Sequence, residues 1–101
     1  MAGAFNAVGI QNALSVAGSA VSLTIPTNTR PSHAIIQVTA ANIRWRADGT
    51  APTTSVGIQV AAGSNIEFMD PMFDYESIIR RIQFIADDAG TATLEVAFFS
   101  L

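Results

Sequence analysis

The chain has no cysteine, no lysine and a single histidine, His33, among its 101 residues. Without cysteine, disulfide bonds and thiolate metal ligands are excluded. One histidine cannot build a two-histidine metal site or a cysteine–histidine pair within one chain. Because these absences remove several common kinds of site, we expect no metal ion, no cofactor and no small-molecule substrate.

His33 follows Pro31 and Ser32, in a stretch whose composition is typical of a loop. No G-x-S-x-G elbow is present to display a nucleophilic serine. We therefore predict a loop histidine and a protein that is not an enzyme. A buried histidine bonded to both a serine and an aspartate would instead favour catalysis.

Charged residues make up only 13% of the chain, against a usual fraction of about 25%. All the basic residues are arginines, which are enriched at protein interfaces, although a bias in genome composition would have the same effect. The net charge of −3 argues against a basic face for nucleic acid. The composition favours a protein-binding surface, with a compact monomer as the alternative.

The first 19 residues are small and uncharged. Glycine, asparagine, glutamine and serine interrupt them too often for a membrane span or the apolar region of a signal peptide, so we expect neither. We predict an extended N-terminal arm with one short strand, residues 1–19, followed by a single domain, residues 20–101.

The rest of the chain alternates apolar and polar residues in short stretches separated by Gly, Pro, Asp and Asn. Strands are predicted at 21–25, 36–40, 43–45, 56–60, 66–68, 78–86 and 94–98, although residues 77–81 are also compatible with one helical turn. Short strands at this spacing are typical of antiparallel sandwiches and barrels. We predict an all-β protein, an antiparallel β-sandwich of jelly-roll type with seven or eight strands.

Residues 70–77 combine acidic side chains with Phe73 and Tyr75. Either Phe73 folds back to plug one end of the sandwich, or the loop docks on a neighbouring subunit. The acids match no calcium-binding loop and are interpreted as solvated.

On the strand that contains Trp45, the Trp45 side chain is expected in the core. Arg44 and Arg46 face the other way, either as contacts with a partner or as charges that protect an edge strand from pairing.

Two segments of the chain, IRWRADGTAPTTSVGIQVAAGSNIEF and RIQFIADDAGTATLEVAFF, resemble small virion structural proteins of tailed bacteriophages. The shared pattern consists of turn and strand residues and covers roughly residues 42–99. The resemblance implies a noncatalytic β-sandwich, most simply a capsid decoration or cement protein. Head–tail, tail or fibre-base roles are alternatives, as is a carbohydrate- or receptor-binding sandwich of a fibre or tail.

As a decoration protein, the chain would be made in the host cytoplasm and reside on the capsid surface of the virion. Its partners would be the major capsid protein and copies of itself, as a homotrimer, without nucleic acid or membrane. The arm would pair with a sheet edge of a partner. The candidate contact residues are Phe5, Ile10, Leu14, Arg44, Arg46, Phe73, Tyr75, Arg80 and Arg81.

Overall fold

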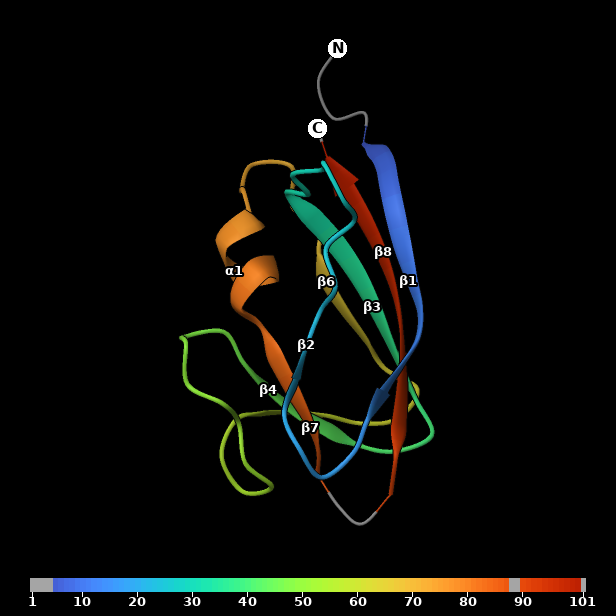
Figure 1. Ribbon diagram of the computed structural model, residues 1–101, viewed down its shortest axis with the longest axis vertical. Helices are drawn as coiled ribbons and strands as arrows, with labels where there is room; N and C mark the ends of the chain where they lie inside the picture. The colour runs from blue at the N-terminus through green and yellow to red at the C-terminus, as the bar shows by residue number, and fades with distance from the viewer. Residues whose placement is uncertain (1–4, 88–89, 101) are drawn as a thin grey trace.

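A computed structural model describes residues 5–87 and 90–100 (Figure 1). The described chain is almost entirely β, with eight strands and one short helix. In chain order the elements are β1 (Asn6–Val16), β2 (Val21–Ser22), β3 (His33–Thr39), β4 (Ile43–Arg46), β5 (Ile58–Val60), β6 (Asn65–Phe68), α1 (Glu76–Arg81), β7 (Gln83–Ala86) and β8 (Ala92–Ser100).

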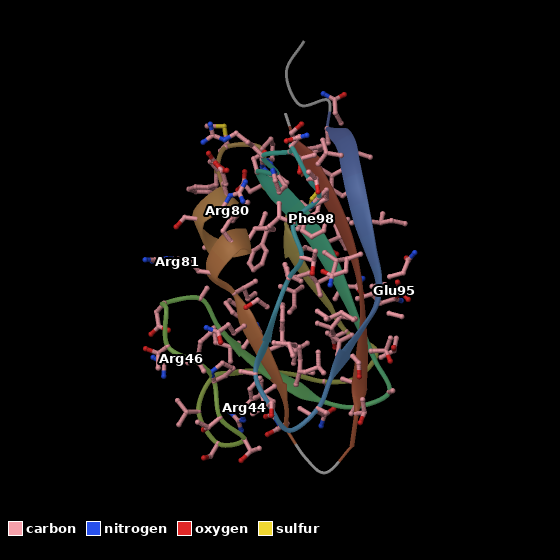
Figure 2. The ribbon with its side chains drawn as sticks, viewed as in Figure 1. Arg44, Arg46, Arg80, Arg81, Glu95 and Phe98 are labelled. Atoms are coloured by element: carbon pink, nitrogen blue, oxygen red, sulfur yellow. The ribbon has the colours of Figure 1, made fainter. Side chains whose placement is uncertain are left out.

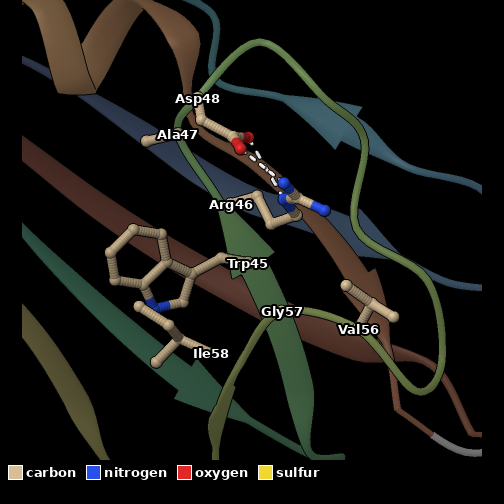
Figure 3. A pocket seen from close by; sticks show the side chains of 7 residues that line it. All are labelled: Trp45, Arg46, Ala47, Asp48, Val56, Gly57 and Ile58. Carbon is tan, nitrogen blue, oxygen red and sulfur yellow. Dashed lines mark hydrogen bonds and ion pairs between the residues drawn. The ribbon is translucent and has the colours of Figure 1, made fainter.

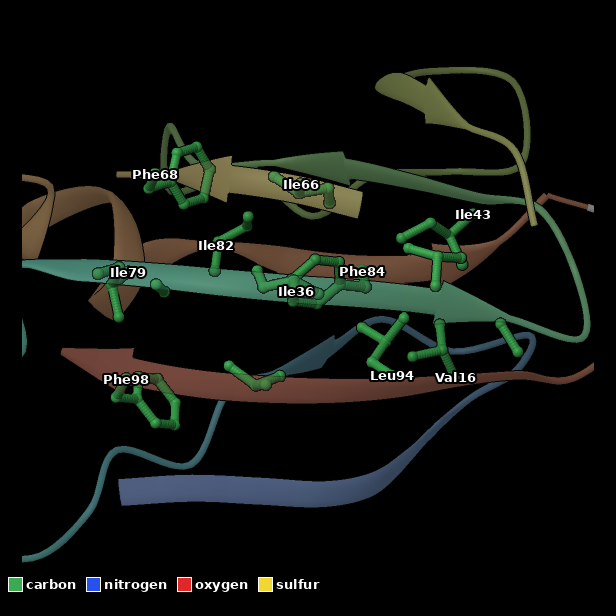
Figure 4. Close-up of a cluster of buried hydrophobic side chains, with 14 of the residues drawn as sticks. Val16, Ile36, Ile43, Ile66, Phe68, Ile79, Ile82, Phe84, Leu94 and Phe98 are labelled. Atoms are coloured by element: carbon green, nitrogen blue, oxygen red, sulfur yellow. The ribbon is translucent and has the colours of Figure 1, made fainter. Parts of the chain in front are cut away.

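The strands form two four-stranded sheets, ordered β1-β8-β3-β6 and β2-β7-β4-β5. Every strand pair is antiparallel. One cluster of buried side chains joins the two sheets: Ile36 and Leu94 from the first lie against Ile43 and Phe84 from the second (Figure 4). The predicted all-β class with two antiparallel, sandwich-like sheets is therefore confirmed.

Alternation along the strands decides which side chains enter this core. On β8, Leu94, Val96 and Phe98 are buried, while the residues between them are only partly covered. On β3, Ile36 and Val38 are completely buried, and exposed Gln37 lies between them. Successive side chains of a strand point to opposite faces of its sheet, so each inward residue is apolar.

The N-terminal segment differs from the predicted arm. Its residues 6–16 form β1, which pairs with β8 from Asn6 opposite Ser100 to Val16 opposite Ala92. Val16 is completely buried, and a Cβ at Gly9 would lie 2.5 Å from Cγ of Pro26. The segment is an edge strand fitted to its neighbours, so the extended arm and the domain boundary at residue 20 are not confirmed. Residues 1–4 lie outside the described residues.

Two register shifts explain why the full length of β1 was not predicted from the sequence. They fall between Ala7 and Gly9 and between Gln11 and Leu14, so the inward face changes parity along β1. Ile10 points outward and is 65% exposed, whereas Leu14 packs against the core. A strand with such irregularities loses the simple two-residue period by which strands are recognised.

The remaining differences concern length. β2 has only two residues, although Leu23 and Ile25 beyond it still pack against the core. The helical turn expected near residues 77–81 is confirmed as α1. Among residues 5–87 and 90–100, no helix has the length and apolar character needed to cross a membrane.

Candidate functional site

The connection between β6 and α1 carries two of the five exposed large apolar side chains of the described chain, including the most exposed one, Met72. We name residues 70–75 the apical loop, because it lies at the end of the sandwich where β1 begins and β8 ends (Figure 1). Met72 is 85% exposed and Phe73 60% exposed. Phe73 therefore does not plug the sandwich, whereas partly buried Tyr75 packs against the core.

Hydrogen bonds hold the apical loop in place. The amide of Tyr75 donates to the Ser32 carbonyl at 2.8 Å, and the amide of Phe73 donates to the Asp70 carbonyl at 3.1 Å. The carboxylates of Asp70 and Asp74 each accept a backbone amide two residues further on, at 2.9 Å. Such local bonds stabilise tight turns. The loop thus presents its apolar tip from a fixed backbone.

His33 lies beneath this loop, and the prediction of a loop histidine is wrong. It is the first residue of β3 and is completely buried. Its Nε2 is 2.9 Å from the Asp70 carbonyl oxygen, and its Nδ1 is 2.7 Å from the Ser32 hydroxyl. Because a carbonyl only accepts, Nε2 donates to Asp70, while the Ser32 hydroxyl bonds the other ring nitrogen, Nδ1. His33 joins the start of β3 to the start of the apical loop.

The contact of Ser32 with His33 resembles two members of a catalytic triad. In a triad a carboxylate orients the imidazole and stabilises its charged form. Here the third group is the main-chain carbonyl of Asp70, and the carboxylate of that residue caps the amide of Met72 instead. A carbonyl orients the ring without supplying a negative charge, so the arrangement is well suited to holding the loop.

Three of the predicted contact residues meet around His33. Its ring lies 4.8 Å from that of Phe5 and 5.4 Å from that of Tyr75, and Phe73 lies 6.3 Å from Tyr75. The two contacts of His33 are edge-to-face, an arrangement that is favourable at these distances, and the Phe73–Tyr75 pair is tilted. Phe5, Phe73 and Tyr75 therefore form one aromatic cluster, whereas Ile10 and Leu14 lie apart from it on β1.

Arg44 and Arg46 lie on β4 and already have partners. Arg44 donates to Asp87 at 2.9 Å, and also to the carbonyls of Thr54 and Gly57. It thereby ties the connection between β4 and β5 to the sheet. Arg46 pairs with Asp48 (Figure 3), and this hydrogen bond lowers the pKa of Asp48 and raises that of Arg46.

Arg80 and Arg81 end α1 and differ in their surroundings. Arg80 binds Glu76 at 3.0 Å, and hydrogen bonds from Arg30 and Arg80 hold the pKa of Glu76 below its ordinary value. Arg81 is exposed and has no ion pair among the residues that the structure describes. Figure 2 shows Arg46, Arg80 and Arg81 on the side of the molecule that carries α1. Within residues 5–87 and 90–100, Arg81 is thus the predicted arginine contact that has no acidic partner.

A second feature is a hollow of about 390 Å³ beside β4, which we name the Trp45 hollow. It is lined by Trp45, Arg46, Ala47, Asp48, Val56, Gly57 and Ile58 (Figure 3). The Trp45 ring meets that of Phe68 edge-on at 5.9 Å, so Trp45 packs against the core, as predicted, and also borders the hollow.

The sequence missed Val56 and Ile58 as surface residues. The sequence places them on one face of a predicted strand without showing which side that face meets, and in the structure they are 48% and 56% exposed. β5 is a three-residue edge strand that begins only at Ile58. Their alternation with polar residues indicated a strand but could not show whether a second sheet covers it.

The acidic residues do not converge on a metal site. Asp70 and Asp74 cap separate amides, and Glu76 binds arginines. In the described ranges, no group of three or more metal-ligating side chains could hold an ion.

Comparison of the chain with protein-family models, curated proteins and solved structures finds no match. Fold and site define a sandwich-like all-β protein that displays a firmly held apolar loop.

Proposed function

We propose that this chain is a noncatalytic structural protein of a bacteriophage virion, most specifically a capsid decoration or cement protein. It binds the outer shell and stabilises contacts between major capsid subunits, with several copies assembling side by side. The resemblance of residues 42–99 to small phage virion proteins supports this assignment. The surface of the molecule supports it independently.

We also infer that the sandwich is a jelly roll. Its strands pair in a nested order, β1 with β8, β2 with β7, β3 with β6 and β4 with β5. An eight-stranded double sheet with this nesting is what a folded-over hairpin produces, and viral capsid and lectin domains use that architecture. The strand order is therefore consistent with both the leading function and its alternative.

The observation that carries the proposal is the exposure of Met72 and Phe73 on the apical loop. Burying a large apolar side chain is worth about 1.5–3 kcal/mol, so leaving two of them in water forgoes stability unless a partner covers them. Hydrogen bonds fix the loop before any partner arrives, so little ordering entropy is lost on docking. Repetition over a shell turns such modest contacts into firm attachment.

Replacing Met72 and Phe73 together by serine should reduce the occupancy of purified capsid shells by about tenfold or more, because a buried apolar anchor contributes over ~1 kcal/mol. Occupancy is measured by sedimenting shells with increasing protein. Ile10→Ser is the matched control, since Ile10 is equally exposed but lies on β1. If the double variant coats shells as fully as the natural chain, the apical loop is not the shell contact.

The alternative, a carbohydrate- or receptor-binding sandwich of a fibre or tail, is favoured by one detail. Sugar sites place an exposed aromatic ring beside polar groups, and exposed Phe73 belongs to the same short loop as Asp70 and Asp74. A glycan array probed with the intact protein separates the two functions. A decoration protein leaves the array blank, whereas a lectin gives signals that Phe73→Ser removes.

A further inference from the structure

The exposed apolar side chains of this molecule gather at two places. Five large ones are exposed in the described ranges: Ile10, Val56, Ile58, Met72 and Phe73. Two of these form the tip of the apical loop, and two border the Trp45 hollow. The tip of the apical loop projects and the Trp45 hollow is recessed, so the two apolar surfaces are complementary in shape.

The Trp45 hollow is suited to receive an aromatic side chain. Figure 3 shows Ile58 beside the Trp45 ring, with Val56 on the other side of β4. Its volume of about 390 Å³ lies within the range of roughly 300–1,000 Å³ that is typical of ligand pockets. Arg44 fixes the wall of the hollow by binding the Gly57 carbonyl at 3.1 Å. The hollow is therefore a preformed, mainly apolar binding site.

The charges around the two surfaces also match. The carboxylates of Asp70 and Asp74 flank the tip of the apical loop and have no cationic partner among the residues described. Arg81 has no acidic partner there either. Because Gln83 pairs with Arg46, Arg81 lies just beyond the end of β7, at the end of β4 that borders the hollow. Arg46 and Asp48, which line the hollow, pair with each other, so Arg81 is the positive charge near the hollow that has no acidic partner among the described residues. The acidic tip of the apical loop is attracted to that charge.

A single chain cannot join its own two surfaces. The apical loop is bonded to Ser32 and His33 at the end of the sandwich, and it contributes no residue to the lining of the hollow. We propose that the apical loop of one copy inserts Phe73 into the Trp45 hollow of a second copy. This contact deepens the proposed function, because the expectation that copies assemble side by side rests on it.

The proposed contact joins unlike surfaces and therefore has a direction. Each copy offers one loop and one hollow, so the contact repeats until it closes into a ring or continues as an open chain. Closure after three copies would give the expected homotrimer. Phe73 of a second copy would cover a recess that is open to solvent in a single chain.

Association is measured by sedimentation and by the fluorescence of Trp45, the only tryptophan. For the natural chain we expect assembly with rising concentration, accompanied by a blue shift of the emission as Phe73 covers the indole. A loop variant, Phe73→Ser, and a hollow variant, Val56→Ser with Ile58→Ser, should each weaken association at least tenfold. Ile10→Ser should assemble normally. A natural chain that stays monomeric, without an emission shift, up to millimolar concentration would overturn the proposal.

Mixing the two variants in equal amounts is the decisive step. One variant retains a loop and the other a hollow, so the mixture should form heterodimers and stop at two copies. A mixture that stays monomeric, or one that builds full rings, would contradict the loop-to-hollow contact. Circular dichroism confirms that each variant is folded. Shell binding by the natural chain is a separate readout. If the natural chain coats shells but the loop and hollow variants assemble normally, this inference alone is refuted. If the natural chain assembles as expected but does not coat shells, the decoration function alone is refuted.

Discussion

Removal of residues 2–18 is expected to abolish cooperative unfolding of the protein. The deletion eliminates β1, whose ladder with β8 extends from Asn6 to Val16, and exposes the edge of β8. It also removes completely buried Val16 and the core contact of Leu14. Two such side chains alone contribute about 3–6 kcal/mol, which is comparable with a whole domain's stability of about 5–15 kcal/mol. Urea titration followed by far-ultraviolet circular dichroism measures the transition.

Ile10→Ser provides the control within the same strand. The Ile10 side chain points to solvent, so the free energy of unfolding should change by less than about 0.5 kcal/mol. The extended-arm interpretation makes the opposite prediction for the deletion, since an arm can be removed without loss of the fold. If the truncated chain unfolds as sharply as the natural chain and at the same urea concentration, the arm interpretation is restored. That result would contradict the conclusion that β1 is an integral strand of the sheet.

The contrast between β1 and β8 shows what the sequence could reveal of the fold. β8 keeps a strict two-residue period through Leu94, Val96 and Phe98, and its prediction is confirmed. The register shifts of β1 destroy that period, although Leu14 and Val16 face the same core. Pairing between the first and last strands is a long-range property, and local alternation contains no information about it.

The candidate site was only partly predictable for a similar reason. Phe73 and Tyr75 were recognised as unusual in an acidic loop, but whether Phe73 is covered depends on the packing of the whole end of the sandwich. His33 was assigned to a loop, because its partner Asp70 lies 37 positions away. The exposure of Ile58 was not foreseen, because nothing local shows that β5 is a short edge strand.

His33→Ala is expected to lower the free energy of unfolding by about 3 kcal/mol. The substitution leaves a cavity between Phe5 and Tyr75, and truncating a large buried side chain typically costs about 2–5 kcal/mol. It also leaves the carbonyl of Asp70 and the hydroxyl of Ser32 without their partner. Chemical denaturation gives the stability change. Hydrogen exchange should show faster exchange at the amides of Phe73 and Tyr75.

Ser32→Ala separates loop anchoring from a general loss of stability. It removes one hydrogen bond to His33 but keeps the ring and its bond to Asp70, so we expect a loss of only about 1 kcal/mol and little change in loop exchange. If His33→Ala destabilised the fold without releasing the apical loop, His33 would be an ordinary core residue. If it does release the loop, shell binding and self-association should both weaken even though Phe73 is still present, because both contacts depend on a loop that is held in position before it docks.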